Sequence, residues 1–349
     1  MIPISVCIIT KNEAERLEKC LSAIKPYGFE IVVVDTGSSD SSKEVAARYT
    51  DKLYDFEWIN DFSAARNYSI SRASHNVILC LDTDEYITKL DLEQLQILIG
   101  QNPKSTGMIE RLDYFEEGGE KRCQICRIER IFNRKYYHYE RAIHEVLVPL
   151  GSIPHTSYDA PLTAEHDGYM GSGEQLREKA LRDRDLLLEE IKAEPDNPYN
   201  YFQVAQSYML MRDMEHACEY FEIAMKHHPN PADEYTPVLI CNYGNLLLDN
   251  NKLEEAILLL SYYDYYDDTV DYLCMIGRAY LLAKQPLKAL PEFVKALTAP
   301  KRISVEAKVP SYYIGFIYEL FGKKDIARGH YQSCGTYAPA LEALERLEH

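Results

Sequence analysis

Hydrophobic and polar positions follow two different periods along the chain. In the first half, short apolar runs rich in β-branched residues end in polar turn residues, at positions 4–10, 30–40 and 77–81. Segments 12–24 and 41–49, which follow the first two runs, carry a helical pattern. Strand and helix alternating at this spacing are typical of a parallel sheet with helices packed on its faces. Ligands of such sheets bind where the carboxyl ends of several strands converge.

The pattern changes after the third run. Beyond it, the sequence pattern is more typical of antiparallel strands, and the candidate strands are 107–115, 123–132 and 143–150. A charge-rich helix is predicted over 173–195, and beyond it the strand signals stop. This change of period marks a domain boundary.

The helical second half contains an internal repeat. In four successive segments a small residue and an alanine lie twelve positions apart: Ala205 and Ala217, Gly244 and Ala256, Gly277 and Ala289, Gly315 and Ala327. A large side chain follows each alanine by four positions. This spacing is typical of tetratricopeptide repeats, in which small residues let two antiparallel helices touch. We therefore predict an α/β domain over residues 1–172, a connecting helix and linker over 173–198, and a helical repeat domain over 199–349.

Composition narrows the classes of function. The 349 residues carry a net charge of -17, which argues against a nucleic-acid partner because phosphate backbones are bound by clustered Lys and Arg. No apolar run approaches the roughly 18 residues that a membrane span needs, and the N-terminus lacks the basic region of a signal peptide. Nine scattered cysteines, an odd number, fit a reducing compartment. We expect a cytoplasmic protein without a membrane span.

Polar side chains follow each of the three apolar runs. They are Thr10, Asn12 and Glu13 after the first, Asp35, Ser38, Ser39 and Asp40 after the second, and Asp82 and Asp84 after the third. Two carboxylates separated by one residue beyond a strand end can bind a hard cation, Mg²⁺ or Mn²⁺, which would then recruit the oxygens of a diphosphate. The alternative is a solvated turn with a helix-capping role. Arg66, upstream in "DFSAARN", is a candidate contact for a phosphate or for Asp82.

Taken together, these motifs resemble the family 2 glycosyltransferases of the GT-A fold. The resemblance is carried by "SVCIITKNEAERLEKCLSAI", "EIVVVDTGSSDSS", "NDFSAARNYSI" and "LDTDEYI", and it continues through "RIFNRKYYHYERAIHEVL" and "EHDGYM". Within the family, a transferase module followed by tetratricopeptide repeats is similar to the peptide S-glycosyltransferases of glycopeptide bacteriocins such as sublancin. The resemblance implies a GT-A domain, a nucleotide-sugar donor and inversion at the anomeric carbon.

The resemblance also assigns roles to residues. It places Thr10, Asn12, Glu13 and Asp35 in the nucleoside pocket and makes Asp82 and Asp84 the metal-binding DxD motif. Thr83, between the two carboxylates, and Arg66 are counted with the donor site.

Inverting transfer needs a group that accepts the proton of the attacking hydroxyl or thiol. His144 and Glu145 in "AIHEV" are the leading candidates: His144 could complete the metal shell, and Glu145 could act as the base or bind the donor sugar. In a strand they would point to opposite faces, whereas a turn would relax that limit. A surface pair without function is the alternative. His166 offers a second imidazole, and Asp113, Glu116 and Glu117 are alternative bases.

Three arginines of segment 123–132 and its vicinity, Arg127, Arg130 and Arg134, are equally balanced between two roles. One of them could face the diphosphate leaving group, which gains negative charge as the glycosidic bond breaks. The alternative is salt bridging on the surface of this acidic protein.

The sequence therefore predicts an inverting, metal-dependent transferase that moves a sugar from a UDP-sugar to a peptide or protein acceptor, on a Cys or Ser/Thr side chain. The repeats would hold the acceptor or a second subunit in a homodimer, since solenoids present extended concave surfaces. One rival is a family 2 enzyme with a saccharide or cell-surface glycan acceptor. Another is a non-catalytic adaptor whose repeats bind partners.

Overall fold

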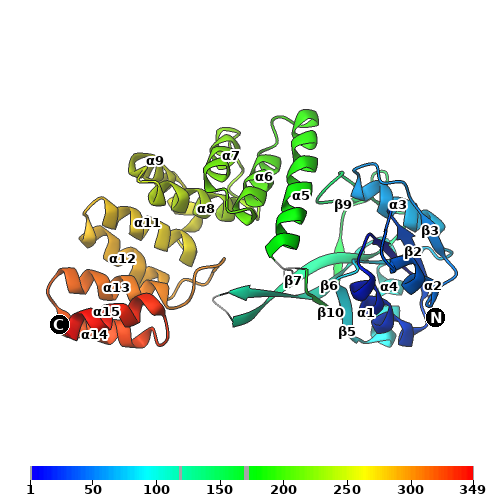
Figure 1. Ribbon diagram of the computed structural model, residues 1–349, viewed down its shortest axis with the longest axis horizontal. Helices are drawn as coiled ribbons and strands as arrows, with labels where there is room; N and C mark the ends of the chain where they lie inside the picture. Colours follow the sequence, from blue (N-terminus) through cyan, green and yellow to red (C-terminus); the bar gives the residue numbers. More distant parts are fainter. Residues whose placement is uncertain (1, 118–119, 169–172, 349) are drawn as a thin grey trace. The chain divides into compact units, whose positions relative to one another are not determined.

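The computed structural model describes residues 2–117, 120–168 and 173–348. The chain divides into two compact units, Met1–Leu186 and Leu187–His349 (Figure 1). The boundary falls within helix α5 (Gly173–Ala193), and each unit has a hydrophobic core of its own. Among the described residues, no helix is both long and apolar enough to cross a membrane.

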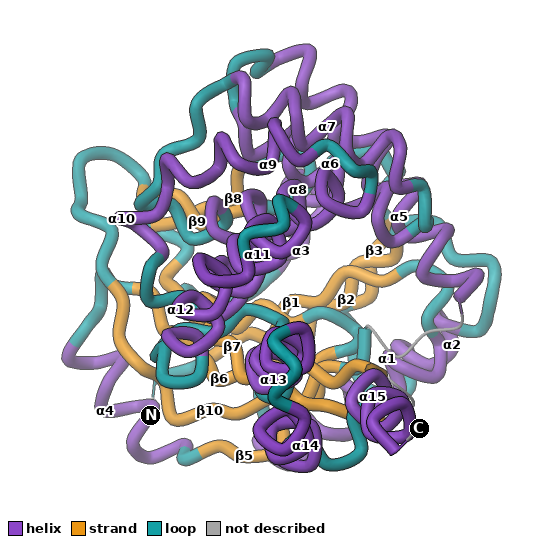
Figure 2. Tube along the Cα trace, turned by 90° about the vertical axis from the view of Figure 1, so that its left-hand side faces the viewer, coloured by secondary structure: helices purple, strands orange, loops and turns teal. Residues whose placement is uncertain are grey.

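The first unit is built on a mixed sheet of eight strands in the order β3-β2-β1-β4-β7-β6-β10-β5. The strands are β1 (Ile4–Thr10), β2 (Glu30–Asp35), β3 (Leu53–Asp55), β4 (Val77–Leu81), β5 (Glu85–Leu90), β6 (Thr106–Glu117), β7 (Glu120–Asn133) and β10 (Ser157–His166). β3, β2, β1 and β4 are parallel to one another. β7 pairs antiparallel with both β4 and β6, and β10 lies between β6 and β5 (Figure 2).

Alternate residues of the parallel strands pack into two different layers. Val6 and Ile8 of β1 belong to a core with the helices α1 (Ala14–Ile24), α2 (Ser42–Ala47) and α4 (Leu92–Gln101). Cys7 belongs to the opposite core, with α3 (Phe62–Arg72) and the hairpin of β8 (Tyr137–Glu140) and β9 (Val146–Pro149). Because both faces are covered, apolar residues predominate on both sides of the central strands β1 and β4. The carboxyl ends of the strands are left for polar chemistry.

The strands predicted at 4–10 and 77–81 are confirmed as β1 and β4, and the parallel pairing of the first three apolar runs is confirmed as well. The predicted strand over 143–150 is shorter than expected, because β9 begins only at Val146. His144 has a φ of 52°, in the left-handed region that a strand excludes. His144 and Glu145 therefore lie in the loop before β9.

The second unit consists of antiparallel helix pairs, which confirms the predicted tetratricopeptide-like repeats (Figure 1). The pairs are α6 (Pro198–Leu210) with α7 (Met214–Lys226), α8 (Thr236–Asp249) with α9 (Leu253–Leu258), α11 (Val270–Leu282) with α12 (Pro286–Ala296), and α13 (Val309–Leu320) with α14 (Lys324–Ser333). The short α10 (Tyr263–Tyr266) follows α9, and α15 (Ala338–Glu348) packs on α14. The alanines of the repeat, Ala217, Ala256, Ala289 and Ala327, are all fully buried.

The small residues of the repeat are required by close helix packing, and this leads to a paired prediction. A Cβ added to Gly277 would lie 2.5 Å from the ring of Phe293, whereas one added to Gly329, on an exposed position of α14, would meet nothing within 4 Å. We expect Gly277→Ala to destabilise the helical unit by about 1–3 kcal/mol through overpacking. Gly329→Ala should stabilise it by up to about 1 kcal/mol, because alanine is the better helix former. Urea denaturation followed by far-ultraviolet circular dichroism measures both, and equal effects would contradict the packing account.

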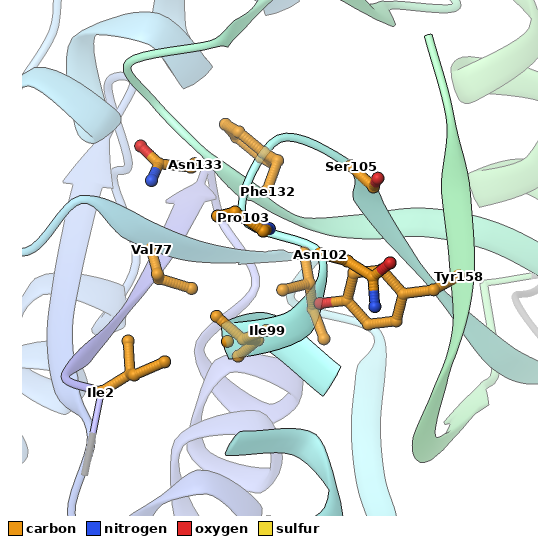
Figure 3. A pocket seen from close by; sticks show the side chains of 11 residues that line it. Ile2, Val77, Ile99, Asn102, Pro103, Ser105, Phe132, Asn133 and Tyr158 are labelled. Atoms are coloured by element: carbon orange, nitrogen blue, oxygen red, sulfur yellow. The ribbon is translucent and has the colours of Figure 1, made fainter. Parts of the chain in front are cut away.

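A largely apolar cavity of about 150 Å³ lies at the opposite end of the sheet from the carboxyl ends of the parallel strands (Figure 3). Ile2 and Val77, which border it, stand at the amino ends of β1 and β4, and Ile99, Phe132 and Tyr158 complete its apolar wall. The polar residues of the DxD region are therefore not part of this cavity.

Candidate active site

The carboxyl ends of β1, β2 and β4 bring the predicted polar residues to one rim of the sheet. Thr10 and Asp35 are direct partners in the parallel register of β1 and β2. β4 runs along the other side of β1, with Leu81 opposite Ile8, so that Asp82 follows at the same rim. The rim therefore gathers residues that lie far apart along the chain.

Two buried oxygens at this rim have no hydrogen-bond partner. They are Oγ1 of Thr10 and Oδ2 of Asp35, on side chains of residues that are 3% and 1% exposed. The other carboxylate oxygen of Asp35 accepts hydrogen bonds from the backbone N–H groups of Gly37 and Ser38, both at 2.9 Å. A buried polar group without a partner costs free energy. These two oxygens are therefore unused hydrogen-bonding groups at the rim.

Asn12 and Glu13 connect the loop after β1 to its neighbours. The side-chain oxygen of Asn12 accepts from the backbone N–H of Ser39 at 2.7 Å, which ties the loops after β1 and β2 together. Glu13 accepts a hydrogen bond from the hydroxyl of Thr83 and another from Arg16 at 3.2 Å. Thr83 is thereby fixed between the two carboxylates of the DxD motif.

Asp82 is held between two guanidinium groups. Nη2 of Arg66 lies 2.7 Å from its Oδ1, and Nη2 of Arg130 lies 2.8 Å from its Oδ2. Burial opposes the negative charge, but Arg66 and then Arg130 lower the pKa of Asp82 well below its usual range. Of the two contacts predicted for Arg66, a phosphate or Asp82, the structure contains the one to Asp82.

Glu85 continues this ion network below the rim. It is fully buried, and its carboxylate accepts from Arg130 at 2.7 and 3.0 Å and from Arg111 at 3.2 Å. Arg111 in turn donates to both oxygens of Asp113, at 2.6 and 2.9 Å. Residues with alternating charges thus follow one another from the DxD motif to β6.

Asp84 belongs to the other end of the same network. Nε2 of His166 lies 3.4 Å from Oδ2 of Asp84, and Nδ1 of His166 lies 3.0 Å from Oδ1 of Asp113. Burial disfavours the charged imidazole, but Asp113 and Asp84 outweigh it and raise the pKa of His166 to about 9. Burial likewise opposes ionisation of Asp113 and Asp84, while His166 is the chief group that lowers the pKa of each.

The predicted pair His144 and Glu145 is placed beside Asp82 through a shared arginine. Nε of Arg66 donates to Oε1 of Glu145, while its Nη2 donates to Asp82. Glu145 therefore lies one side chain away from the DxD motif, and His144 precedes it in the same loop. The imidazole in contact with Asp84 is that of His166.

The remaining candidate arginines and alternative bases lie at different distances from the DxD motif. Arg127 pairs with Asp159 at 2.9 Å on the surface, and Arg134 donates to the backbone carbonyls of Ile70 and Ala73. Of the three arginines considered for the diphosphate, only Arg130 contacts the DxD motif. Asp113, an alternative base, is bound by Arg111 and His166, and the side chains of Glu116 and Glu117 lie outside the described residues.

Comparison with known proteins identifies the first unit. Residues 5–153 match the model of glycosyl transferase family 2. The first unit is a family 2 glycosyltransferase domain. Over 267 residues the chain is 27% identical to the SPbeta prophage-derived glycosyltransferase SunS of Bacillus subtilis, covering 72% of this chain and 60% of that protein. It is also 29% identical over 245 residues to a TPR repeat-containing protein of Synechococcus elongatus, covering 67% of this chain and 60% of that protein.

The chain thus spans about 60% of the length of these two relatives. Among solved structures, the crystal structure of YrrB, a TPR protein with an unusual peptide-binding site, aligns with 50% of this chain and 88% of its own at 14% identity and a TM-score of 0.41.

In the glycosyltransferase domain, the residues around Asp84 fit a divalent cation that also binds substrate. Among the described residues, no three His, Cys, Asp or Glu side chains converge on one point. A Mg²⁺ ion bound with a nucleotide needs only one or two carboxylates, since phosphate oxygens and water supply the other ligands. Both oxygens of Asp82 are paired with arginines, whereas the described contacts of the Asp84 carboxylate involve its Oδ2, which faces Nε2 of His166 at 3.4 Å and the backbone of Gly168. Asp84 is therefore the carboxylate better placed to bind the ion.

The raised pKa of His166 predicts a pH dependence of stability in this domain. A group whose pKa rises from 6.5 to about 9 on folding contributes stability below pH 6.5, and the contribution is lost as the pH rises through 9. We expect wild type to exceed His166→Gln by up to about 3 kcal/mol at pH 6 and the difference to shrink by pH 9.5. Urea denaturation at several pH values, followed by the fluorescence of the single tryptophan, Trp58, measures this. A difference independent of pH would contradict the assignment.

Sequence reasoning missed Glu85 and Arg111. Glu85, directly after the DxD motif, opens β5 and is fully buried. Arg111 lies in the middle of a strand pattern, "GMIERLDYF", where a charge among apolar residues is the signal that could have marked it. A charged residue within a buried strand requires a partner of opposite charge.

Proposed function

We propose that this protein transfers a sugar from a UDP-sugar to a peptide or protein acceptor with inversion at the anomeric carbon, with Mg²⁺ or Mn²⁺ held at Asp84. The observation that carries the proposal is the pair of unpartnered buried oxygens on Thr10 and Asp35 at the rim that also holds the DxD motif. Family 2 membership of this domain supports the reaction class.

The pair favours a uracil base. Oδ1 of Asp35 already accepts two backbone hydrogen bonds, so Oδ2 is the acceptor left for a ligand, and the hydroxyl of Thr10 stands beside it. Uracil presents one N–H between two carbonyls, which matches one acceptor next to one hydroxyl donor. Guanine presents two adjacent N–H groups, and cytosine places an acceptor nitrogen opposite the carboxylate. A buried hydrogen-bonding site rejects a ligand that leaves its polar groups unpaired.

The base assignment leads to a prediction for nucleotide binding. Asp35→Asn keeps the oxygen that accepts from Gly37 and Ser38 but turns an N–H₂ donor toward the N–H of uracil. We expect UDP affinity to fall about 100-fold, since a charge-assisted hydrogen bond is lost and two donors face each other. Isothermal calorimetry with UDP, GDP and CDP measures this, and wild type should prefer UDP. Tighter binding of GDP than UDP by wild type would contradict the uracil assignment.

Several residues of the chain would have separate roles near the diphosphate. The bound cation supplies positive charge that stabilises the leaving diphosphate. Asp84 would hold the ion, while Arg66 and Arg130 keep Asp82 ionised and fixed in orientation beside it. The hydrogen bond from Thr83 to Glu13 fixes the turn between the two carboxylates. Such preorganisation lets charges act without rearrangement during the reaction.

Cysteine is the acceptor that the rim fits best. Glu145, with His144 beside it, is the proposed base, but Arg66 holds its carboxylate, and Arg111 and His166 hold that of Asp113. A serine hydroxyl needs a strong base to become a nucleophile, whereas a thiol ionises near neutral pH. Burial opposes ionisation of Asp113, but His166 and Arg111 lower the pKa of Asp113, and Arg66 engages the carboxylate of Glu145. An acceptor that needs little help from a base, a thiol, is therefore favoured.

The helical unit supplies a surface suited to an extended peptide. Polar side chains, three of them amides, link successive first helices of the repeats: Nδ2 of Asn242 donates to Gln206 at 3.1 Å, and the guanidinium group of Arg278 donates to Asn245 at 2.6 Å. Side-chain amides carry both a donor and an acceptor, as a peptide backbone does. We assign the acceptor contacts to this row. A second copy of the chain is the other occupant considered, and light scattering would detect a homodimer.

The experiment that tests the function is an acceptor and donor panel. Purified protein is incubated with UDP-, GDP- and CDP-sugars and three peptides that differ only in one Cys, Ser or Thr, and with an oligosaccharide as a separate arm. Intact mass spectrometry reports sugar and acceptor together. A mass gain on the Cys peptide with a UDP-sugar supports the proposal. Transfer to the oligosaccharide alone overturns the peptide acceptor, and UDP binding without transfer to any acceptor favours an adaptor.

A further inference from the structure

Asp167, the residue directly after β10, is the centre of a second charged cluster at the rim. Tyr86 of β5 donates to its Oδ1 at 3.0 Å, and Lys19 and Arg16 of α1 approach its carboxylate at 3.3 and 3.5 Å. The ammonium group of Lys19 also lies 3.6 Å from the centre of the Tyr86 ring. Asp167 therefore joins three different elements, and none of the roles assigned above involves it.

The cluster determines where the chain passes Asp84. The backbone N–H of Asp167 donates to the carbonyl of Asp84 at 3.3 Å. Gly168 follows, and it packs so closely that an added Cβ would lie 2.5 Å from both Oδ2 of Asp84 and Nε2 of His166. A small displacement of Gly168 would therefore change the space available to the Asp84 carboxylate. The anchor for this stretch of backbone is the Asp167 side chain.

Helix α1 holds the DxD turn from two sides. Glu13, at its start, binds Thr83, and Arg16 joins Glu13 at 3.2 Å to Asp167 at 3.5 Å. Thr83 and the backbone beside Asp84 are thus fixed to the same helix. Side chains that orient a metal ligand commonly matter about 10- to 100-fold for metal affinity.

We propose that Asp167 is a positioning residue: through Arg16, Lys19 and Tyr86 it fixes the Gly168 backbone against Asp84 and so sets the orientation in which Asp84 binds the cation of a metal–diphosphate complex. This rests on the proposed function, because it takes the cation and the nucleotide diphosphate from there. Asp167 contacts neither of them. Its effect is confined to the cation half of the donor site, away from Thr10 and Asp35.

The test separates cation binding from nucleotide binding. UDP affinity is measured by calorimetry with and without Mn²⁺, and Mn²⁺ binding alone is measured by electron paramagnetic resonance. In Asp167→Ala we expect Mn²⁺ to bind about 10-fold more weakly and to strengthen UDP binding about 10-fold less than in wild type. UDP affinity without the metal should stay within about twofold, since the Thr10 and Asp35 pair is untouched. Gly168→Ala, which presses directly on Asp84, should reproduce the defect.

Controls distinguish positioning from general loss of structure. Asp167→Glu restores the charge and should recover Mn²⁺ affinity to within about threefold of wild type. Asp159→Ala removes an exposed ion pair with Arg127 and should change neither affinity. If Asp167→Ala does not fold, as judged by Trp58 fluorescence, Lys19→Gln, which loses one ion pair and the contact with Tyr86, takes its place and should show the same selective defect.

Two results would overturn the proposal, and they differ from each other. If wild type gains UDP affinity from Mn²⁺ and Asp167→Ala gains as much, the positioning role is wrong while the proposed function stands. If wild-type UDP binding does not respond to Mn²⁺ or Mg²⁺, the metal assignment of the proposed function fails, and the role of Asp167 fails with it.

Discussion

Replacing Asp84 with asparagine will lower the rate of sugar transfer by about 100- to 1,000-fold, the range seen when one preorganised electrostatic contact to a transition state is removed. Asparagine has the shape of aspartate but lacks the charge that would hold the cation against the leaving diphosphate. His166 keeps its second partner, Asp113, so the network below the rim stays connected. The rate loss is measured by mass spectrometry of the peptide product at saturating UDP-sugar and Mn²⁺.

A matched variant shows whether this loss is specific. Asp159 is an aspartate of the same domain, 67% exposed at its side chain and paired only with Arg127 among the described contacts. Asp159→Asn should retain the wild-type rate and unfold at the wild-type urea concentration, whereas Asp84→Asn loses its ion pair with His166 and should be less stable but still folded under the assay conditions. Full transfer by Asp84→Asn in the presence of a chelator would show that neither the carboxylate nor a cation takes part.

The parts of the fold that could be predicted are those fixed by one local pattern. β4 is apolar at every position, β1 is apolar except for Ser5 and the terminal Thr10, and both are bounded by turn residues, so the sequence defines their ends. β10, in contrast, contains Pro161 and exposed positions, and β5 carries polar residues in its second half. Their pairing depends on distant neighbours, and sequence spacing does not contain that information.

The repeats were predictable for a related reason. Gly277 touches Phe293 of the next helix, and Gly315 touches Tyr331 in the same way, so one packing requirement recurs at one interval. When the same close helix contact recurs at a fixed spacing, the sequence carries small residues at that spacing. The contacts in the glycosyltransferase domain do not recur at a fixed spacing, so they produce no periodic pattern in the sequence.

The sequence predicted several residues that the structure brings to one rim of the sheet, but not how these residues pair with one another. The sequence predicted that Asp82 lies at the rim and that a bound cation offsets the negative charge of the neighbouring carboxylates. In the structure Arg130, 48 positions further along the chain, and Arg66 offset the charge of Asp82. β7, which carries Arg130, pairs antiparallel with β4, and a pairing across so many residues follows from topology alone. The proposed cation is therefore assigned to the substrate complex at Asp84, and the fold itself does not need it to neutralise Asp82.

The same network makes Glu85 the residue whose loss should cost the most stability. Its carboxylate is fully buried and offsets two guanidinium groups, those of Arg111 and Arg130, on two neighbouring strands. A buried charge left without its partner retains the cost of desolvation and gains no attraction in return. We therefore expect Glu85→Ala to lower the free energy of unfolding of the glycosyltransferase domain by about 3–5 kcal/mol.

The measurement can be restricted to this domain, because the single tryptophan of the chain, Trp58, lies in it and packs edge-on against Phe62, with the ring centres 4.8 Å apart. Urea denaturation followed by its fluorescence should show a large shift for Glu85→Ala. Glu85→Gln should be less severe, since the amide oxygen still accepts one hydrogen bond, and Asp159→Ala should change stability by less than about 1 kcal/mol. A Glu85→Ala variant as stable as Asp159→Ala would mean that Asp82 and Asp113 alone compensate the two arginines. In that case the buried network would not depend on Glu85, and the acidic residue after the DxD motif would need another explanation.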